Sequence, residues 1–265
     1  MSIFQVIIIA IIEGITEFLP VSSTGHMIIA SSVMGIAADD FTKLFEIAIQ
    51  LGAILSVVVL YWRKFFVQTS ASFYIKLITA VIPALILGAV FSKKIDALLE
   101  SPLTVSITML VGGVVLLFID SLFKAPTIET EQQVSLPKAF IIGVWQCLAM
   151  IPGTSRSAAS IIGGMQQKLT RSLAAEFSFF LAVPTMAAAT GYKLMKAYKE
   201  NPGLLTNKQN LLALGIGNLI AFVVAMIAIK FFIGYLQKHG FKLFGWYRVI
   251  MGGVLLVLVL TGYLK

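Results

Sequence analysis

Residues 13–26 read EGITEFLPVSSTGH and interrupt an apolar stretch that runs from residue 3 to residue 38. Glu13 and Glu17 come first, and a break with Pro20, three hydroxyl residues and a glycine follows. Each apolar half is too short to cross the ~30 Å hydrocarbon layer of a bilayer comfortably. Irregular backbone at membrane depth is tolerated only where it is buried in protein or lines a wet cavity. The stretch therefore predicts a re-entrant helical hairpin.

A second stretch, residues 139–166, has the same design. It is apolar on both sides of a break at residues 152–157, which read PGTSRS. Neither half is long enough to span a bilayer, and the break again combines proline, glycine and hydroxyl residues. We expect a second re-entrant hairpin here.

The composition places the whole chain in a membrane. Of its 265 residues, 58% are hydrophobic and only 12% are charged, whereas about a quarter of the residues in a soluble domain are charged. The net charge is +8, but the basic residues are scattered and form no face that could bind a nucleic acid. The single cysteine, Cys147, excludes an intrachain disulfide.

Six uncharged runs are long enough to cross the bilayer, and short loops join them. Aromatic residues crowd the ends of these runs, as expected at membrane interfaces. The predicted spans are residues 47–62, 77–92, 101–119, 177–192, 209–229 and 249–264. The predicted fold is an all-α polytopic membrane protein with six transmembrane helices and two re-entrant helical hairpins.

The two halves of the chain carry matching motifs in the same order. Residues 14–17 (GITE) match residues 143–146 (GVWQ), each a few positions before a break, and a Gly-Gly pair recurs near the end of each half. We expect one membrane domain built from two repeats: repeat 1 at 1–122, a linker at 123–137 and repeat 2 at 138–265. Three crossings per repeat are an odd number, so the second repeat has inverted topology relative to the first.

The distribution of basic residues predicts the orientation. Loops on the side of the N-terminus carry eight Lys and Arg residues, and the opposite loops carry eleven, Lys76 and Arg248 among them. Cytoplasmic loops are the richer in these residues. We expect both termini outside.

Glu13 and Glu17 lie four residues apart, so on a helix their carboxylates share a face. Ionisable groups inside a membrane are costly and usually mark function. These two approach a helix C-terminus, whose dipole disfavours anions. A divalent cation, Mg²⁺ or Ca²⁺, carried with a phosphorylated substrate would offset them, since both ions prefer carboxylate oxygens. Two solvated interfacial glutamates are the alternative.

The first break supplies groups that suit an anion. A helix that begins at this break would turn free N–H groups toward a phosphate. Ordinary N-capping by Ser22 or Ser23 is the alternative. His26, in the first turn, adds a group for proton transfer. We expect phosphate binding at Ser22, Thr24 and Gly25, and catalysis at Ser23 and His26.

The second break supplies a cation. Arg156 is the only charged residue in 139–167. An unpaired arginine in a membrane costs ~3 kcal/mol on an insertion scale, and its planar guanidinium suits bidentate recognition of phosphate. We expect it to bind phosphate together with Gly153, Thr154 and Ser155. A structural ion pair with one of the glutamates is the alternative.

Together, the two motifs resemble the undecaprenyl-diphosphatase family of bacterial inner membranes, the bacitracin-resistance type. The resemblance covers nearly the whole chain, including its length and the order of its repeats. The family's acidic pair falls on Glu13 and Glu17, its serine–histidine motif on residues 22–26 and its arginine on Arg156. Ala158 stands where the family commonly has a glycine after Ser-Arg-Ser, which removes no functional group.

The resemblance implies hydrolysis of undecaprenyl diphosphate to undecaprenyl phosphate and inorganic phosphate. This reaction recycles the carrier lipid for peptidoglycan and other envelope polymers and confers bacitracin resistance. The expected location is the bacterial inner membrane, with the active site open to the outer face. Expected partners are the polyprenyl diphosphate and membrane lipids, and a homodimer is among the assemblies we expect.

The expected catalytic group is Glu17, Ser23, His26 and Arg156. We favour attack by Ser23 Oγ on the terminal phosphorus, with His26 as its acid–base partner. A metal-activated water, or His26 itself, remains open as the nucleophile. The rival function is an ion-coupled transporter or lipid flippase, because inverted repeats with broken helices are also typical of carriers. A purely structural membrane scaffold would leave the buried ionisable groups unexplained.

Overall fold

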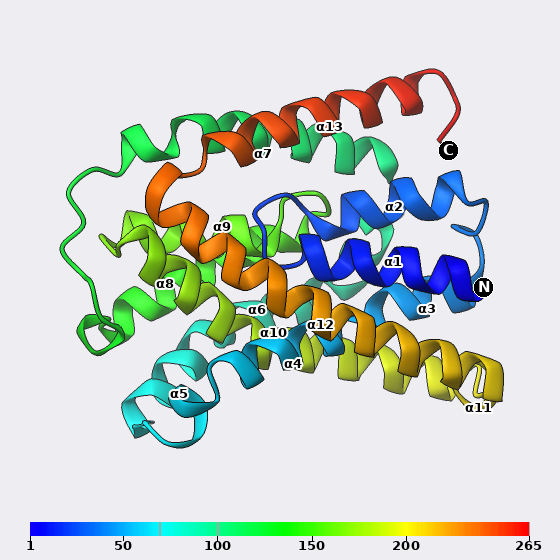
Figure 1. The fold of residues 1–265 in the computed structure, drawn as a ribbon, viewed down its shortest axis with the longest axis horizontal. Helices are drawn as coiled ribbons and strands as arrows, with labels where there is room; N and C mark the ends of the chain where they lie inside the picture. The colour runs from blue at the N-terminus through cyan, green and yellow to red at the C-terminus, as the bar shows by residue number, and fades with distance from the viewer. Residues whose placement is uncertain (69, 100, 265) are drawn as a thin grey trace.

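The computed structural model describes residues 1–68, 70–99 and 101–264, the side chains of residues 92–99 excepted. These residues form a bundle of helices, most of them running along the long axis of the molecule (Figure 1). The α-helices are α1 (Ile3–Thr16), α2 (Ser23–Val33), α3 (Asp40–Ala48), α4 (Gln50–Leu60), α5 (Trp62–Phe66), α6 (Ala71–Leu99), α7 (Pro102–Leu122), α8 (Leu136–Gln146), α9 (Arg156–Gln166), α10 (Arg171–Glu200), α11 (Gly203–Thr206), α12 (Lys208–His239) and α13 (Lys242–Leu260). Two 3₁₀ helices, η1 (Glu131–Gln133) and η2 (Cys147–Met150), lie on either side of α8.

The predicted spans are confirmed as helices. Within the described residues, six segments are long and apolar enough to cross a membrane: 40–60, 71–91, 102–122, 171–200, 208–239 and 242–260. The first of these consists of α3 and α4, which meet at Ile49.

The helices extend further than the uncharged runs. α6 continues to Leu99, so the connection expected at residues 93–100 is helical as far as the structure describes it, and residue 100 lies outside the described residues. The difference arises because lysine and other charged residues end an apolar run without ending a helix.

Two pairs of short helices flank the predicted breaks, one pair at each break. α1 and α2 contact each other and run in opposite directions on either side of the first break (Figure 1). α8 and α9 flank the second break, with η2 between them. α1 and α8 are apolar helices of less than spanning length.

In each pair, the first helix packs against a helix from the other half of the chain through a glycine. A Cβ at Gly14 in α1 would come 2.9 Å from the carbonyl oxygen of Ala221 in α12. A Cβ at Gly143 in α8 would collide with the carbonyl oxygen of Ala80 in α6. These glycines allow close helix packing, so α1 lies against α12 and α8 lies against α6.

The main hydrophobic core lies beside the two breaks. It includes Phe18, which directly follows Glu17, and Phe179 of α10, whose ring packs edge-on at 5.3 Å between centroids. Phe18 is fully buried. The core therefore fixes the backbone of the first break next to α10.

A buried ion-pair cluster attaches the linker to the bundle. Lys76 of α6 lies 2.9 Å from Glu131 Oε1 and also donates to the carbonyl oxygen of Glu131, and Lys64 lies 3.1 Å from Glu131 Oε2. Lys76 is buried, so counting it among loop cations was wrong. It lies within α6, where Glu131 neutralises it.

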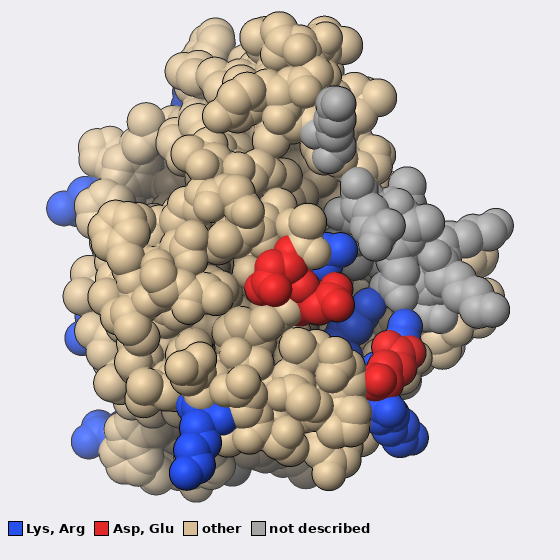
Figure 2. Space-filling model, turned by 90° about the vertical axis from the view of Figure 1, so that its right-hand side faces the viewer, with Lys and Arg blue, Asp and Glu red and all other residues tan. Residues whose placement is uncertain are grey.

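On the end of the molecule near the N-terminus and α11, an acidic patch lies near the middle of the face with basic side chains beside it, and most of the remaining described surface is uncharged (Figure 2). α3 and α11 both lie at this end, and Leu204 of α11 packs against the cluster that contains Phe41 of α3.

We therefore predict that residues 40 and 206 face the same side of the membrane. Cysteines placed at Asp40 and Thr206 in a Cys147→Ala background should react alike with a membrane-impermeant maleimide applied to intact cells. A cysteine at Glu129, in the linker at the other end, should react only after the membrane is opened. Reaction of residues 40 and 206 from opposite sides would rule out this arrangement.

Candidate active site

The two breaks meet at one cavity of about 680 Å³. Its lining includes seven of the predicted site residues: Glu17, Ser22, Ser23, Thr24, Gly153, Ser155 and Arg156. The remaining wall comes largely from small and apolar residues of α6 and α10, among them Ala84, Gly88, Ala188 and Ala189. The cavity therefore has a polar end at the breaks and an apolar groove between two long helices.

Both breaks end in the same local geometry. Ser22 and Ser155 have a φ of 72°, in the left-handed region, and each directly precedes a helix. Their hydroxyls accept hydrogen bonds from Gly25 N at 3.4 Å and Ala158 N at 3.3 Å, respectively. Such backbone costs of order 1–3 kcal/mol for a residue other than glycine and persists where surrounding structure enforces it. The capping interpretation thus holds for Ser22, and both serines also line the cavity.

Glu17 joins the two breaks. Ser23 Oγ donates to Glu17 Oε2 at 2.6 Å, and Arg156 Nη2 donates to Glu17 Oε1 at 3.1 Å. The structure thus pairs Ser23 with Glu17, whereas His26 was expected as its partner. Glu17 can reach Ser23 because it caps the end of α1, while Ser23 begins α2.

Arg156 is held from two further sides. Its Nη1 donates to the carbonyl oxygen of Ser178 at 3.0 Å and to Ser178 Oγ at 3.3 Å. Its guanidinium lies 5.5 Å above the centroid of the Phe18 ring. Nε is buried and has no hydrogen-bond partner among the described residues. The side chain is therefore fixed in place while its Nε donor stays open.

His26 contacts the backbone and α13. Its Nδ1 lies 2.7 Å from the carbonyl oxygen of Ser22 and its Nε2 lies 2.6 Å from the Tyr247 hydroxyl. A carbonyl oxygen only accepts, so Nδ1 carries the proton, and Nε2 of the neutral ring accepts from Tyr247. The two rings are stacked with centroids 5.4 Å apart. His26 therefore holds the turn at Ser22 against α13.

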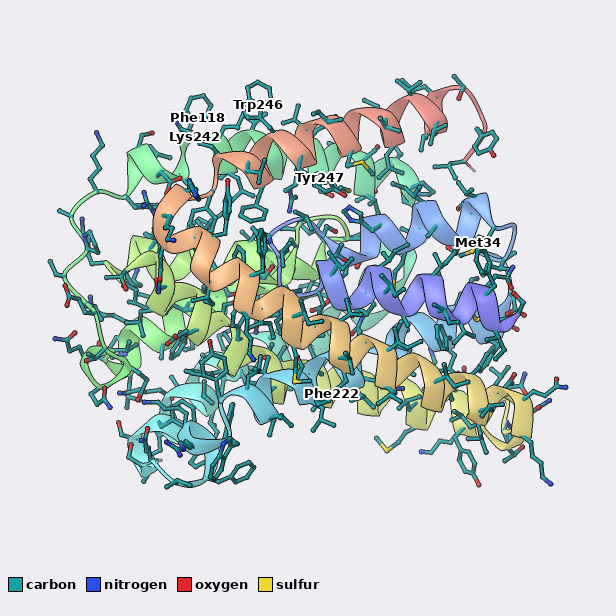
Figure 3. The ribbon with its side chains drawn as sticks, in the orientation of Figure 1. Met34, Phe118, Phe222, Lys242, Trp246 and Tyr247 are labelled. Carbon is teal, nitrogen blue, oxygen red and sulfur yellow. The ribbon has the colours of Figure 1, made fainter. Side chains whose placement is uncertain are left out.

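Sequence reasoning missed Tyr247 because it follows Trp246 at the start of a span, where aromatic residues suggest an interfacial belt. In the structure Trp246 points away from the bundle, while Tyr247 points inward (Figure 3).

Arg248 was also misread. It was counted as a loop cation, but it is fully buried in α13. Its guanidinium donates to the carbonyl oxygens of Pro20, Met109, Thr108, Gly153 and Thr154, at 2.9–3.3 Å. Carbonyls at a break have no helical donor and need another partner. Arg248 supplies donors to both breaks at once, and no sequence signal distinguishes it from the other basic residues near span ends.

Glu13 is not among the residues that line the cavity. It is fully buried, and neither carboxylate oxygen has a hydrogen-bond partner among the described residues. A buried carboxylate without a partner is costly. A cation beside it would satisfy these oxygens, so the residue fits the predicted metal site.

The described residues contain no cluster of three or more His, Cys, Asp or Glu placed to hold a metal. Two glutamates alone fit Mg²⁺ well, because this ion is usually bound by one or two carboxylates plus phosphate oxygens and water.

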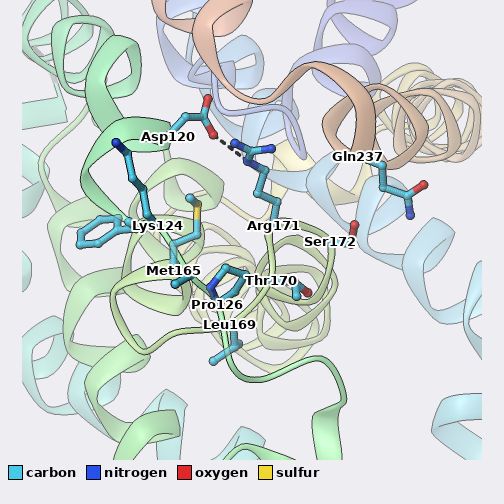
Figure 4. A pocket seen from close by; sticks show the side chains of 11 residues that line it. Asp120, Lys124, Pro126, Met165, Leu169, Thr170, Arg171, Ser172 and Gln237 are labelled. Carbon is cyan, nitrogen blue, oxygen red and sulfur yellow. Dashed lines mark ion pairs between the residues drawn. The ribbon is translucent and has the colours of Figure 1, made fainter.

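A second cavity, of about 430 Å³, lies apart from these residues, at the start of the linker (Figure 4). It is lined by residues of α7, the linker, α9, α10 and α12, and Arg171 of α10 pairs with Asp120 of α7 across it at 2.7 Å. It contains none of the predicted site residues.

Comparison with known proteins agrees with this site. The family described as bacitracin resistance protein BacA matches residues 6–254. A protein of Flavobacterium psychrophilum named undecaprenyl-diphosphatase is 62% identical over 258 residues, which cover 97% of this chain and 96% of that protein. Proteins of the same name from Flavobacterium johnsoniae and Bdellovibrio bacteriovorus are 58% and 49% identical, covering 97% and 99% of this chain and 96% and 98% of theirs. The resemblance carried by the two motifs is confirmed, and the chain belongs to the bacitracin resistance protein BacA family.

Proposed function

We propose that the chain is a membrane-embedded phosphatase that hydrolyses undecaprenyl diphosphate to undecaprenyl phosphate and inorganic phosphate. The observation that carries this proposal is the contact of Ser23, Glu17 and Arg156 at the polar end of a cavity with an apolar groove. Such a cavity suits a lipid with a charged head. The names of the relatives and their near full-length coverage support the same activity.

Phosphate binding falls to Arg156 and the two helix starts. The open Nε donor of Arg156 would be satisfied by a phosphate oxygen. α2 and α9 both begin at the cavity, and the N-terminus of a helix attracts anions. Ser22, Thr24, Gly25, Gly153, Thr154 and Ser155 belong to these two starts.

For the reaction, Ser23 Oγ attacks the terminal phosphorus while Glu17 takes its proton. The bond between this phosphorus and the bridging oxygen breaks, and undecaprenyl phosphate leaves with the electron pair and with the proton that Glu17 took from Ser23. Water then hydrolyses the phosphoserine. The contact of Ser23 with Glu17 supports this assignment. Direct attack by water is the alternative, and an acid–base role of His26 stays a prediction.

This network favours hydrolysis over the alternative function, an ion-coupled transporter or lipid flippase. A carrier needs groups that bind its ion or substrate, but it needs no hydroxyl held against a carboxylate beside a phosphate-binding arginine.

A divalent cation, Mg²⁺ or Ca²⁺, would be held by Glu13 and Glu17 together with oxygens of the diphosphate. The open oxygens of Glu13 support this site. When bound, such an ion would neutralise charge that develops on phosphorus.

The two helix pairs are proposed to be re-entrant hairpins in inverted repeats at 1–122 and 138–265, joined by the linker at 123–137. The equivalent serine caps of α2 and α9 support this arrangement. It is also supported by the packing of each half on the other, with α1 against α12 and α8 against α6. The polyprenyl tail would lie in the groove between α6 and α10.

The proposed location is the bacterial inner membrane, with the site open to the outer face. A homodimer stays a prediction. The family and the six apolar helices support a multi-pass membrane protein.

The first test removes the proposed nucleophile and the phosphate-binding group. Ser23→Ala should lower turnover at least ~10²-fold, since the attacking oxygen is lost. Arg156→Lys should have a comparable effect, because a lysine cannot contact Glu17, Ser178 and phosphate at once. His26→Ala should also abolish turnover. The measurement is phosphate release in detergent.

His239→Ala is the control and should be near wild type, because this histidine is exposed at the end of α12. Equal losses at His26 and His239, or full activity of Ser23→Ala, would contradict the proposed site.

The second test concerns the cation. Phosphate release should require Mg²⁺ or Ca²⁺. Glu17→Gln should lower activity severely, because Glu17 also contacts Ser23 and Arg156, whereas Glu13→Gln should mainly raise the cation concentration that is required. The measurement is a cation titration of the wild type and both variants. Full wild-type activity in excess EDTA would remove the cation from the reaction.

A further inference from the structure

Gln146 is a polar side chain of the cavity that the reaction above does not use. It ends α8, lines the cavity and is 2% exposed. Its Nε2 donates to Thr185 Oγ1 at 3.1 Å. Its Oε1 is buried and has no hydrogen-bond partner among the described residues. Leaving such an acceptor unsatisfied costs about 1–3 kcal/mol, so a ligand that donates to it would bind favourably.

The neighbouring threonine fixes which way the amide faces. Thr185 Oγ1 donates its single proton to the carbonyl oxygen of Leu181 at 2.8 Å. Toward Gln146 it can therefore only accept, and the amide must present its NH₂ group to it. The hydrogen-bond pattern thus determines that the carbonyl oxygen is the open end.

Gln146 occupies the position in the second helix pair that Glu17 occupies in the first. Glu17 caps the end of α1, Gln146 ends α8, and both line the cavity. Glu17 is committed to Ser23 and Arg156. The Glu17 carboxylate thus already accepts hydrogen bonds from the protein, whereas the uncharged Gln146 oxygen accepts none from the described residues.

An open carbonyl oxygen selects a particular ligand group. It repels an ionised phosphate oxygen, because both atoms are acceptors, and it attracts an O–H group. We propose that Gln146 Oε1 accepts a hydrogen bond from the water that completes hydrolysis, and that Thr185 holds the amide in this orientation. The proposal rests on the proposed phosphatase function.

In this step a lone pair of the water forms the new bond to phosphorus, and the bond from phosphorus to Ser23 Oγ breaks with its electron pair on Oγ. One water proton passes to Glu17 and from there to Oγ, which restores the serine. The other proton stays on the phosphate product, and it is the one that faces Gln146. The water thus donates one O–H group to Glu17 and the other to Gln146.

Methanol distinguishes this role from a structural one. Methanol has a single O–H, which Glu17 must take, so its attack gains nothing from Gln146. Gln146→Met, which keeps the volume but removes the acceptor, should slow attack by water ~10-fold or more and leave attack by methanol nearly unchanged, since misplacing a reactant by 1 Å can cost ~10²-fold.

The experiment measures inorganic phosphate and methyl phosphate formed from a polyprenyl diphosphate in detergent with added methanol. The ratio of methyl phosphate to phosphate should rise several-fold in Gln146→Met and in Thr185→Val, which keeps the shape but frees the amide. Gln237→Met, at an exposed glutamine of α12 outside this cavity, is the matched control and should keep the wild-type ratio.

An unchanged ratio in Gln146→Met would overturn the proposal, whether or not total turnover falls. A polyprenyl methylenediphosphonate tests the other source of an O–H group, a protonated phosphate oxygen. Its Kd should be the same for wild type and Gln146→Met, and weaker binding to the variant would assign Gln146 to the substrate instead. Absence of phosphate release by the wild type would instead refute the proposed function itself.

Discussion

The site depends on one buried carboxylate, that of Glu17, which touches a serine from its own helix pair and an arginine from the other. A buried ion pair repays its desolvation only when further hydrogen bonds satisfy the remaining polar atoms. Here Ser23 and Ser178 supply such bonds. Removing either charge would leave the other buried and unpaired, so the two halves of the chain are required together.

A second buried arginine, Arg248, stabilises the turns that carry this contact. Arg248 donates hydrogen bonds to backbone carbonyls of both breaks and of α7. It thereby satisfies backbone that helices cannot, which allows irregular backbone to be buried. Tyr247, the preceding residue, holds His26. One turn of α13 therefore fixes the turns on which Ser23 and Arg156 lie.

Much of this could be predicted from local patterns. Proline, glycine and charged residues are rare in apolar sequence. The two breaks, the spans and the groups that line the cavity can therefore be recognised in the sequence. The partners of Arg248 and Gln146 were not predictable, since each depends on how segments far apart in the chain pack. Arg248 lies 228 residues from Pro20, for example. A cation near a span end has the same local pattern whether it reaches lipid headgroups or the protein interior. Glu17 is only six residues from Ser23, and their contact depends on the path of the turn between α1 and α2.

The role proposed for Glu17 is to prepare Ser23 for attack on phosphorus. A direct test is to mix the protein with a polyprenyl diphosphate labelled in its terminal phosphate and to quench single turnovers over time. We expect label to be bound transiently to Ser23, as identified by mass spectrometry of the peptide, and Glu17→Gln to slow the appearance of this phosphoserine. Label that passes into inorganic phosphate without any covalent stage, or that is found on His26, would contradict this role.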